Sequence, residues 1–353
     1  MSDKQAMIAM SGGVDSSVAA YLTQQAGYSC SAATMQLHTD GFNQDVEDAH
    51  RIARILNMPF HVFDFREAFR LHVIEDFIRC YEAGLTPNPC VTCNRQLKFD
   101  RFLRKAQELG CDSIVTGHYA RIQEDLGTGR QLLYKAVDEA KDQSYFLGLL
   151  TQEQLKHTQF PLGEFTKEQA REIAQQQGFV NARKRDSQDI CFVPDGDFYK
   201  FIKGYTGKNY ASGDFLDLQG KPVGKHHGAV AYTLGQRKGL GIAMGEPVYV
   251  CAKDMAANTV TVGPNEALYH RSLLAVNWSW FPFETLTEPM RVKARARSRM
   301  IEQPAWVYPL ENGEVRVEFD APQRAITPGQ AVVLYDGDLV VGGGIITTVL
   351  QNE

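Results

Sequence analysis

The stretch IAMSGGVDSSVAAYL, residues 8–22, joins an apolar run to a helical pattern through a loop of small residues. The run QAMIAM (residues 5–10) predicts a buried strand, and SSVAAYLTQQAG (residues 16–27) predicts a helix that ends at Gly27. Paired glycines let a backbone approach an anion, serines offer hydroxyl groups, and a helix N-terminus adds free N–H groups. We therefore expect a phosphate-binding loop between the first strand and the first helix.

This loop differs from the two commonest phosphate motifs. No Gly-Lys-Ser/Thr sequence follows the glycines, and the pattern G-x-G-x-x-G is absent from the stretch. A plain strand-to-helix turn is the alternative interpretation. The order of strand, loop and helix favours the nucleotide site.

Residues 1–204 alternate apolar runs with helical patterns. Further strands are expected at residues 29–38, 60–65 and 112–120, and further helices at residues 43–59 and 94–110. Alternation of this kind is typical of a parallel sheet with helices on both faces. The sequence thus predicts an α/β N-terminal domain.

After Gly204 the chain becomes rich in glycine and in short β patterns separated by Asn-Gly and Asp-Gly turns. Such spacing is typical of small β domains and barrels. For the 353 residues we expect three domains: 1–204 as the α/β domain, 205–273 as a small central β domain, and 274–353 as a C-terminal β-barrel.

Composition restricts the classes of protein to consider. The formal net charge of −5 argues against non-specific coating of nucleic acid, although a local basic face can still bind it. No apolar run approaches the ~20 residues of a membrane span, and no signal-peptide pattern opens the chain. Seven cysteines, an odd number, suggest metal or thiol chemistry in a reducing compartment. We expect a cytoplasmic protein without a membrane partner.

The stretch TPNPCVTCNRQLKFD, residues 86–100, places Cys90 and Cys93 in a proline-flanked turn. A C-x-x-C pair can hold a metal, cycle between thiol and disulfide, or present a reactive thiolate. The residues alone leave these three interpretations open.

The stretch RVKARARSR, residues 291–299, carries five cations at every second position. In a strand, such residues share one face and can contact RNA phosphates. A solvated edge strand that is guarded by charge is the alternative.

Several motifs together carry a family resemblance. SGGVDSS resembles the pyrophosphatase loop of the N-type ATP pyrophosphatases. TPNPCVTCNRQLKFD, TGHYARI, KDQSYFL, DSQDICFV, HHGAVAYTLGQRKGLGI and TPGQAVVLYDGD occur in the order seen in tRNA-specific 2-thiouridylases, over nearly the whole chain. The resemblance implies an adenine nucleotide alpha hydrolase-like N-terminal domain and a C-terminal barrel that binds tRNA. It also implies a sulfurtransferase that adenylates the C2 oxygen of uridine 34, the wobble base of tRNA, and replaces it with sulfur, releasing AMP and pyrophosphate.

The resemblance also assigns residues. It makes Cys93 the catalytic nucleophile and Cys191 the persulfide carrier, and it implies that Asp15 helps to hold Mg²⁺ against ATP. The expected ATP contacts are Ala9, Met10, Ser11, Gly12, Gly13, Val14, Asp15, Ser16, Ser17, Met35 and Gly117. The expected tRNA contacts are Asn88, Pro89, Cys90, His118, Lys141, Asp142, Gln143, Arg295, Ala296 and Gln330.

Two positions depart from the family pattern. Many members carry Asp where this chain has Cys90, so Cys90, Cys93 and Cys191 together suggest a [4Fe–4S] cluster with one open iron. A two-cysteine persulfide route and a zinc clip are the alternatives. Ala296 replaces a usual Tyr, which puts an aromatic contact there in doubt.

The expected partners are tRNAs of the lysine, glutamate and glutamine type and a sulfur donor such as a cysteine desulfurase or a relay protein. The alternatives to a 2-thiouridylase are a 4-thiouridine synthase, an amidotransferase-type synthetase, and a non-catalytic RNA-binding module with a structural C-x-x-C. A pure binding module needs no phosphate loop. The C-terminal β domains and the pair Cys93 and Cys191 argue against the synthetases.

Overall fold

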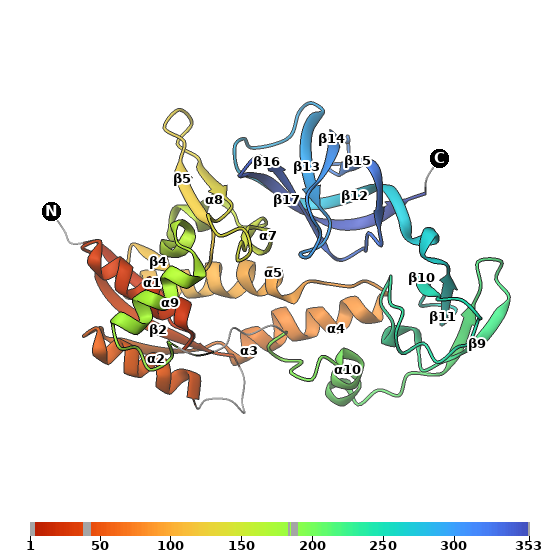
Figure 1. Cartoon of the computed structure of the whole chain (residues 1–353), viewed down its shortest axis with the longest axis horizontal. Coiled ribbons are helices and arrows are strands. Elements are labelled where there is room, and N and C mark those ends of the chain that lie inside the picture. The colour runs from red at the N-terminus through yellow and green to blue at the C-terminus, as the bar shows by residue number, and fades with distance from the viewer. Residues whose placement is uncertain (1–3, 38–43, 183, 185–189, 352–353) are drawn as a thin grey trace.

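The computed structural model describes residues 4–37, 44–182, 184 and 190–351 of the chain. An α/β domain, a small β module and a β-barrel surround two helices that run through the middle of the molecule (Figure 1). The two chain ends lie on opposite sides. Within the described ranges, no helix is both long and apolar enough to cross a membrane.

The N-terminal domain is built on a parallel sheet, as the strand–helix alternation predicts. The sheet has the order β3-β2-β1-β4-β7, and all four pairings are parallel. Its strands are β1 (Gln5–Ala9), β2 (Ser29–Gln36), β3 (Phe60–Asp64), β4 (Ser113–Val115) and β7 (Thr158–Gln159).

Helices cover both faces of this sheet. One apolar cluster joins β1 and β2 to α1 (Val14–Gln25), α2 (Gln44–Ile55) and α9 (Lys167–Gln176). A second cluster joins the opposite face to α3 (Arg66–Phe69), η1 (Arg70–Ile74), α4 (Glu75–Glu82), α5 (Pro89–Cys93), η2 (Asn94–Arg101) and α6 (Phe102–Glu108). Short elements complete the domain: α7 (Ser144–Leu147), α8 (Gln152–Lys156) and η3 (Pro161–Glu164). The α/β prediction is confirmed.

The helix expected at residues 94–110 has an unexpected winding. It begins earlier, at Pro89, and the segment η2 is a π-helix, in which the N–H of Phe102 bonds to the carbonyl of Leu97 five residues back. The wider turn changes which residues share a face of the helix.

The central module follows α10 (Phe198–Thr206). Its sheet has the order β10-β11-β8-β9 and encloses a small core around Phe215 and Val250. The elements are β8 (Gly213–Leu216), β9 (Pro222–His226), η4 (Ala229–Ala231), β10 (Tyr249–Asp254), β11 (Thr259–Gly263) and η5 (Asn265–Leu268).

The C-terminal part is a closed barrel of six strands, as predicted, because β12 pairs with both β15 and β17. The strands are β12 (Tyr269–Trp280), β13 (Met290–Arg295), β14 (Gln303–Pro309), β15 (Val315–Arg324), β16 (Ala331–Asp336) and β17 (Leu339–Leu350). The barrel interior is apolar, with Val317, Phe319 and Leu334 fully buried.

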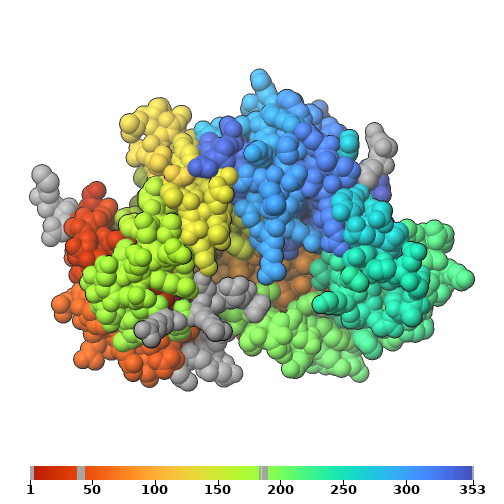
Figure 2. Space-filling view, viewed as in Figure 1, coloured from red at the N-terminus to blue at the C-terminus, as the bar shows by residue number. Residues whose placement is uncertain are grey.

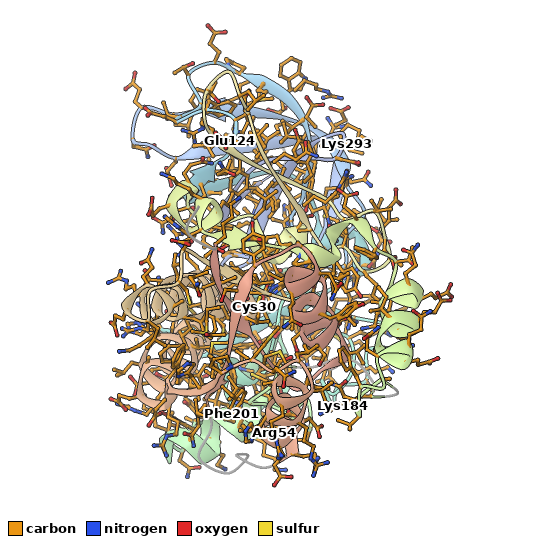
Figure 3. All side chains as sticks on the ribbon, turned by 90° about the vertical axis from the view of Figure 1, so that its left-hand side faces the viewer. Cys30, Arg54, Glu124, Lys184, Phe201 and Lys293 are labelled. Atoms are coloured by element: carbon orange, nitrogen blue, oxygen red, sulfur yellow. The ribbon has the colours of Figure 1, made fainter. Side chains whose placement is uncertain are left out.

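A hairpin from the N-terminal part extends the barrel sheet. Strand β6 (Gln131–Tyr134) pairs with β17, and β5 (Arg121–Glu124) pairs with β6. Figure 3 shows Glu124 of the hairpin and Lys293 of the barrel at the same end of the molecule, away from Cys30 in the parallel sheet. This hairpin, which has no counterpart among the predicted elements, fixes the barrel to the N-terminal domain.

Lys253 lies where the central module meets α4. Its Nζ donates to the carbonyl of Tyr232 at 2.9 Å and lies 5.9 Å from the ring centre of Tyr81. Burial lowers the pKa of Lys253 to about 8. The fold therefore makes this ammonium group lose its proton at a lower pH than an exposed lysine does.

The substitution Lys253→Met tests this burial. In the unfolded chain a lysine titrates near ~10.4, so below pH 8 folding carries the full penalty for a buried ammonium, and the penalty fades as the pH rises from 8 toward ~10.4. We expect the melting temperature of the variant minus that of the wild type to be more positive at pH 7 than at pH 10. Lys225→Met, an exposed lysine of β9, is the control. A difference that does not change with pH would contradict the assignment.

Candidate active site

The predicted phosphate loop lies at the point where the strand order of the sheet reverses. Strands β2 and β4 flank β1 on either side, and ligands of open α/β sheets bind at the carboxyl ends of strands at such a point. The loop, residues 10–13, leads from the end of β1 into α1. Gly12 has φ +72°, and a Cβ there would lie 2.3 Å from the carbonyl oxygen of Asp45. Only glycine fits this position.

The serines of the loop divide into two groups. Ser16 and Ser17 are buried, and their hydroxyls donate to the carbonyl of Gly13 at 3.1 and 3.0 Å. Ser11 is exposed, and its Oγ accepts from the N–H of Gly13. Ser16 and Ser17 therefore shape the loop, whereas Ser11 is presented to a ligand.

Gly117 packs directly against this loop. A Cβ there would lie 2.7 Å from the carbonyl carbon of Asp15 and from the nitrogen of Ser16. The turn after β4 and the start of α1 are thus in backbone contact. Met35, another expected nucleotide contact, is half-buried in β2.

Asp15 is held by two residues that sequence reasoning missed. Lys167, only 8% exposed in its side chain, donates to both carboxylate oxygens at 2.8 Å, and Tyr119 donates through its hydroxyl to one of them at 2.8 Å. Lys167 is the first residue of α9, where a cation opposes the helix dipole. Because a lysine is unfavourable at a helix N-terminus, its position in the sequence indicated that a carboxylate lies near it.

A second cation lies at the loop. Lys184 donates to Asp45 at 2.5 Å and Asp48 at 3.0 Å in α2, and to the carbonyl of Gly12 at 3.3 Å. The buried side chain of Asn181 donates to the same carbonyl at 3.0 Å. Figure 3 shows Lys184 at the surface beside the α/β domain. These contacts anchor Asn181 and Lys184 to the phosphate loop. The basic run Arg183–Arg185, a further candidate for RNA contact in the sequence, has Arg183 and Arg185 outside the described residues.

Three cysteines, Cys90, Cys93 and Cys191, lie near enough to one another for their charges to interact. Cys90 and Cys93 are three positions apart in α5 and share a helix face. Cys191 joins them from a distant segment: burial and then charge on Cys93 and Cys90 raise the pKa of Cys191 to about 11. Burial also raises the pKa of Cys90 and of Cys93. All seven cysteines of the chain are free thiols.

Lys98 is the cation among these thiols. Its charge opposes the effect of burial by lowering the pKa of Cys90, Cys93 and Cys191. It lies five residues after Cys93, a spacing that shares a face in the π-helix η2 but not in an α-helix. Sequence reasoning that assumed an α-helix could not place it there.

His118 packs against the helix that continues from the cysteine segment. It follows Gly117 and contacts the rings of Phe99 in η2 and of Phe160. Burial, and then the charge of Lys98, hold its pKa well below the usual value, and its Nδ1 lies 2.7 Å from Oγ1 of Thr116. At neutral pH the ring is therefore uncharged and offers hydrogen bonds only.

The barrel contacts the turn that precedes Cys90. The N–H of Thr86 donates to the carbonyl of Pro328 at 2.9 Å, and Nε2 of Gln330 donates to the carbonyl of Thr86 at 2.8 Å. Asn88 caps α5 by accepting from the N–H of Cys90, and the buried Pro89 opens the helix. The expected contacts Asn88, Pro89, Cys90 and Gln330 are thus brought together.

The KDQ segment has internal partners. Asp142 accepts from the N–H and hydroxyl of Ser144, and Gln143 accepts from the N–H of Tyr119 at 3.0 Å. Lys141 is half-buried beside them. Arg295, at the end of β13, lies 3.6 Å from Asp142, so this segment and the barrel meet here.

The basic strand differs in part from its prediction. Val292, Ala294 and Ala296 face inward as expected, and Arg291 and Lys293 are exposed. Arg291 is paired with Asp320, so the face is partly neutralised. The strand ends at Arg295, so Arg297 and Arg299 lie beyond it and the predicted alternation does not extend to residue 299. Ala296 is 1% exposed in the barrel core and cannot offer its side chain to RNA in this arrangement.

Comparison with known proteins covers the whole chain. The family model described as tRNA methyl transferase HUP domain matches residues 4–195, the tRNA methyl transferase PRC-barrel domain matches 199–264, and the Aminomethyltransferase beta-barrel domain matches 270–346. The tRNA-specific 2-thiouridylase MnmA of Clostridioides difficile (strain 630) is 47% identical over 354 residues, covering 98% of each chain. The protein of the same name from Acetivibrio thermocellus is 49% identical over 358 residues, covering 98% of this chain and 100% of the relative.

A solved structure is similar at a greater distance. The U34-tRNA thiolase NcsA from Methanococcus maripaludis with its [4Fe-4S] cluster is 16% identical, with a TM-score of 0.37, over 58% of this chain and 68% of that chain. This similarity is too slight to bear on the site described above.

The substitution Lys167→Met tests the contact with Asp15. It leaves a carboxylate without its cation beside the phosphate loop, and we expect about a ten-fold loss in ATP-dependent pyrophosphate release, equivalent to roughly 1.4 kcal/mol of transition-state stabilisation. Lys156→Met, at an exposed lysine of α8, is the control. Full pyrophosphate release by a folded Lys167→Met enzyme would show that Asp15 needs no such partner.

Proposed function

Since the chain belongs to the tRNA-specific 2-thiouridylase family, we propose how its site uses ATP to form 2-thiouridine in tRNA. The enzyme is a sulfurtransferase that acts on a tRNA uridine. The observation that carries the proposal is that Gly117 packs on the phosphate loop while the next residue, His118, packs on Phe99 of η2, which continues the helix that holds Cys90 and Cys93. Activation of an oxygen and delivery of sulfur need both parts within reach of one base.

ATP is proposed to bind along the loop from Ala9 to Ser17, with Met35 and Gly117 beside the nucleotide. The N–H groups of the loop and the N-terminus of α1 face the phosphates. The C2 oxygen of the uridine attacks the α-phosphorus, which releases pyrophosphate and leaves an adenylated base. Asp15 would hold Mg²⁺ against the phosphates, where one carboxylate often suffices because phosphate oxygens and water complete the shell.

Sulfur then replaces the adenylated oxygen. In the persulfide route, the terminal sulfur of a persulfide on Cys191 attacks C2, and AMP leaves with the oxygen. The thiolate of Cys93 attacks Sγ of Cys191, which forms a Cys93–Cys191 disulfide and releases the base as 2-thiouridine. A thiol reductant must open that disulfide before the next turnover.

The third thiol supports a cluster as the sulfur carrier. Cys90, Cys93 and Cys191 would each bind a different iron of a [4Fe–4S] cluster, and such a group supplies an open iron that can carry sulfide. Among the described residues, no three Cys, His, Asp or Glu side chains converge enough to hold a single ion. A structural zinc site normally has four protein ligands, and no second C-x-x-C occurs in the chain.

The substrate proposal extends to the base and the partners. We assign uridine 34 of tRNAs of the lysine, glutamate and glutamine type, flipped out of its stack against Asn88 and Pro89. His118, Lys141 and Arg295 are further residues that we propose to contact the RNA. A cysteine desulfurase or a relay protein would supply sulfur in the cytoplasm. The domain limits 1–204, 205–273 and 274–353 belong to the same proposal.

Cys93→Ser and Cys191→Ser test the sulfur step. Each variant is expected to abolish thiolation, because a hydroxyl neither carries nor accepts the sulfur, while its affinity for tRNA stays within two-fold of the wild type, roughly the scatter of context effects. Nucleoside mass spectrometry of tRNA after reaction and filter binding measure the two properties. Cys251→Ser, in the central module, should behave as wild type. Thiolation that persists in either variant, or that appears as 4-thiouridine, would refute the assignment.

Cys90→Ser tests the cluster. We expect anaerobically purified wild type to absorb near ~400 nm and to contain about four irons per chain, the content of one [4Fe–4S] group, and we expect Cys90→Ser to lose most of that iron. A colourless, iron-free wild type that thiolates tRNA with a persulfide donor would leave the two-cysteine route. Cys111→Ser, a buried cysteine outside the group, controls for general loss of iron.

A further inference from the structure

The motif YTLGQRKGLGI, residues 232–242, has no role in the chemistry above. It forms a glycine-rich loop of the central module that packs against the barrel; Figure 2 shows the two parts in contact. The N–H of Gly235 donates to the carbonyl of Val250, and Gly235 has φ +81°. The loop is therefore fixed at its base, while Arg237 and Lys238 beyond it are exposed.

Gly235 lets the loop pack closely against the barrel beside two arginines. A Cβ at Gly235 would lie 3.0 Å from Cβ of Ala325, 3.5 Å from Nη1 of Arg324 and 3.9 Å from Nη2 of Arg297. Two guanidinium groups from different parts of the barrel chain thus lie at the edge of one loop. An anion that binds against both could accept hydrogen bonds from both.

Neutral partners hold these two arginines in place. Nη2 of Arg297 donates to Oγ1 of Thr327 at 2.6 Å, and Nε of Arg324 donates to Oδ1 of Asn265 at 2.8 Å. Arg324 also lies 5.0 Å from the ring centre of Tyr249. Over the part of the chain that the structure describes, neither arginine has a carboxylate at ion-pair distance, in contrast to Arg291 with Asp320.

Like charges held together without an acid favour an anionic ligand. Burial, and then the neighbouring charge of Arg324, lower the pKa of Arg297. The repulsion between two cations falls when an anion binds between them. Arg237 and Lys238, at the rim, add to the positive potential.

We propose that Arg297 and Arg324, where the loop of Gly235 meets the barrel, bind a backbone phosphate in the anticodon arm of the substrate tRNA. The inference rests on the proposed function, because it names the RNA as the ligand. The turn from Thr327 to Gln330 supports the inference. Thr327 accepts a hydrogen bond from Arg297, and Gln330 donates one to the carbonyl of Thr86 in the turn beside the proposed active site. An RNA strand whose base enters at Asn88 therefore has its backbone near this seam.

Arg324→Gln is the first test, since Arg324 is exposed and its loss should not unfold the barrel. Binding of a tRNA, and of its isolated anticodon stem–loop, is measured by filter binding over a range of salt concentrations. We expect affinity to fall about five- to ten-fold for both RNAs and the slope of log K against log salt to decrease by about 1, the loss of one phosphate contact. Arg324→Lys should retain the slope. At saturating tRNA the thiolation rate should match wild type, with only KM raised.

Arg104→Gln removes the same charge from α6, where Arg104 is exposed and paired with Asp100, and should bind RNA as wild type does. Arg297→Gln provides the second variant, with its melting temperature as the check on folding.

Wild-type affinity and slope in both Arg324→Gln and Arg297→Gln would overturn the site, as would a loss of ATP binding instead of RNA binding. A loss with whole tRNA but not with the stem–loop would overturn the placement on the anticodon arm. If wild type binds tRNA but forms no 2-thiouridine, the proposed reaction fails while the phosphate site stands.

Discussion

The contact between Asp15 and Lys167 is the constraint on which the site depends. It joins the first turn of α1 to the first turn of α9, two segments far apart in the chain, at the edge where the phosphate loop opens. An ammonium with 8% exposure needs a compensating carboxylate. Tyr119 donates to the same carboxylate, and Gln143 holds the N–H of Tyr119. Through this chain of contacts, the loop proposed to bind ATP and the segment proposed to bind tRNA share one hydrogen-bond network.

The positions of the thiols depend on a different feature, the winding of one helix. Cys90 and Cys93 face the same way because α5 is an α-helix, and Lys98 joins them because the next segment is a π-helix. Cys93 is buried and Cys90 and Cys191 are exposed, and the charge of Lys98 lowers the pKa of all three, against the rise caused by partial burial. The site thus holds thiols that stay protonated until a ligand or a reaction partner removes the proton, which suits a group that must not react before its substrate arrives.

The parts of the fold that follow local pattern were predictable. Strand, small-residue loop and helix at residues 5–27 indicated the nucleotide site, and alternation in residues 1–120 indicated the parallel sheet, because both rules act within a few residues. Lys167 was missed because its partner is 152 residues away and only the packing of α9 brings them together. Lys98 was missed because no simple pattern distinguishes a π-helix from an α-helix. Cys191 was identified by family motif, yet its approach to Cys90 and Cys93 is a property of the folded chain.

The hairpin of β5 and β6 has a consequence for synthesis of the protein. Tyr134 pairs with Leu339, so the hairpin leaves the ribosome about two hundred residues before its partner strand exists. At 5–20 residues per second, that interval lasts roughly 10–40 s. During this time the outer edge of β6 offers unpaired N–H and C=O groups to any passing strand. Nascent chains halted before residue 339 should therefore be the ones that most need a chaperone.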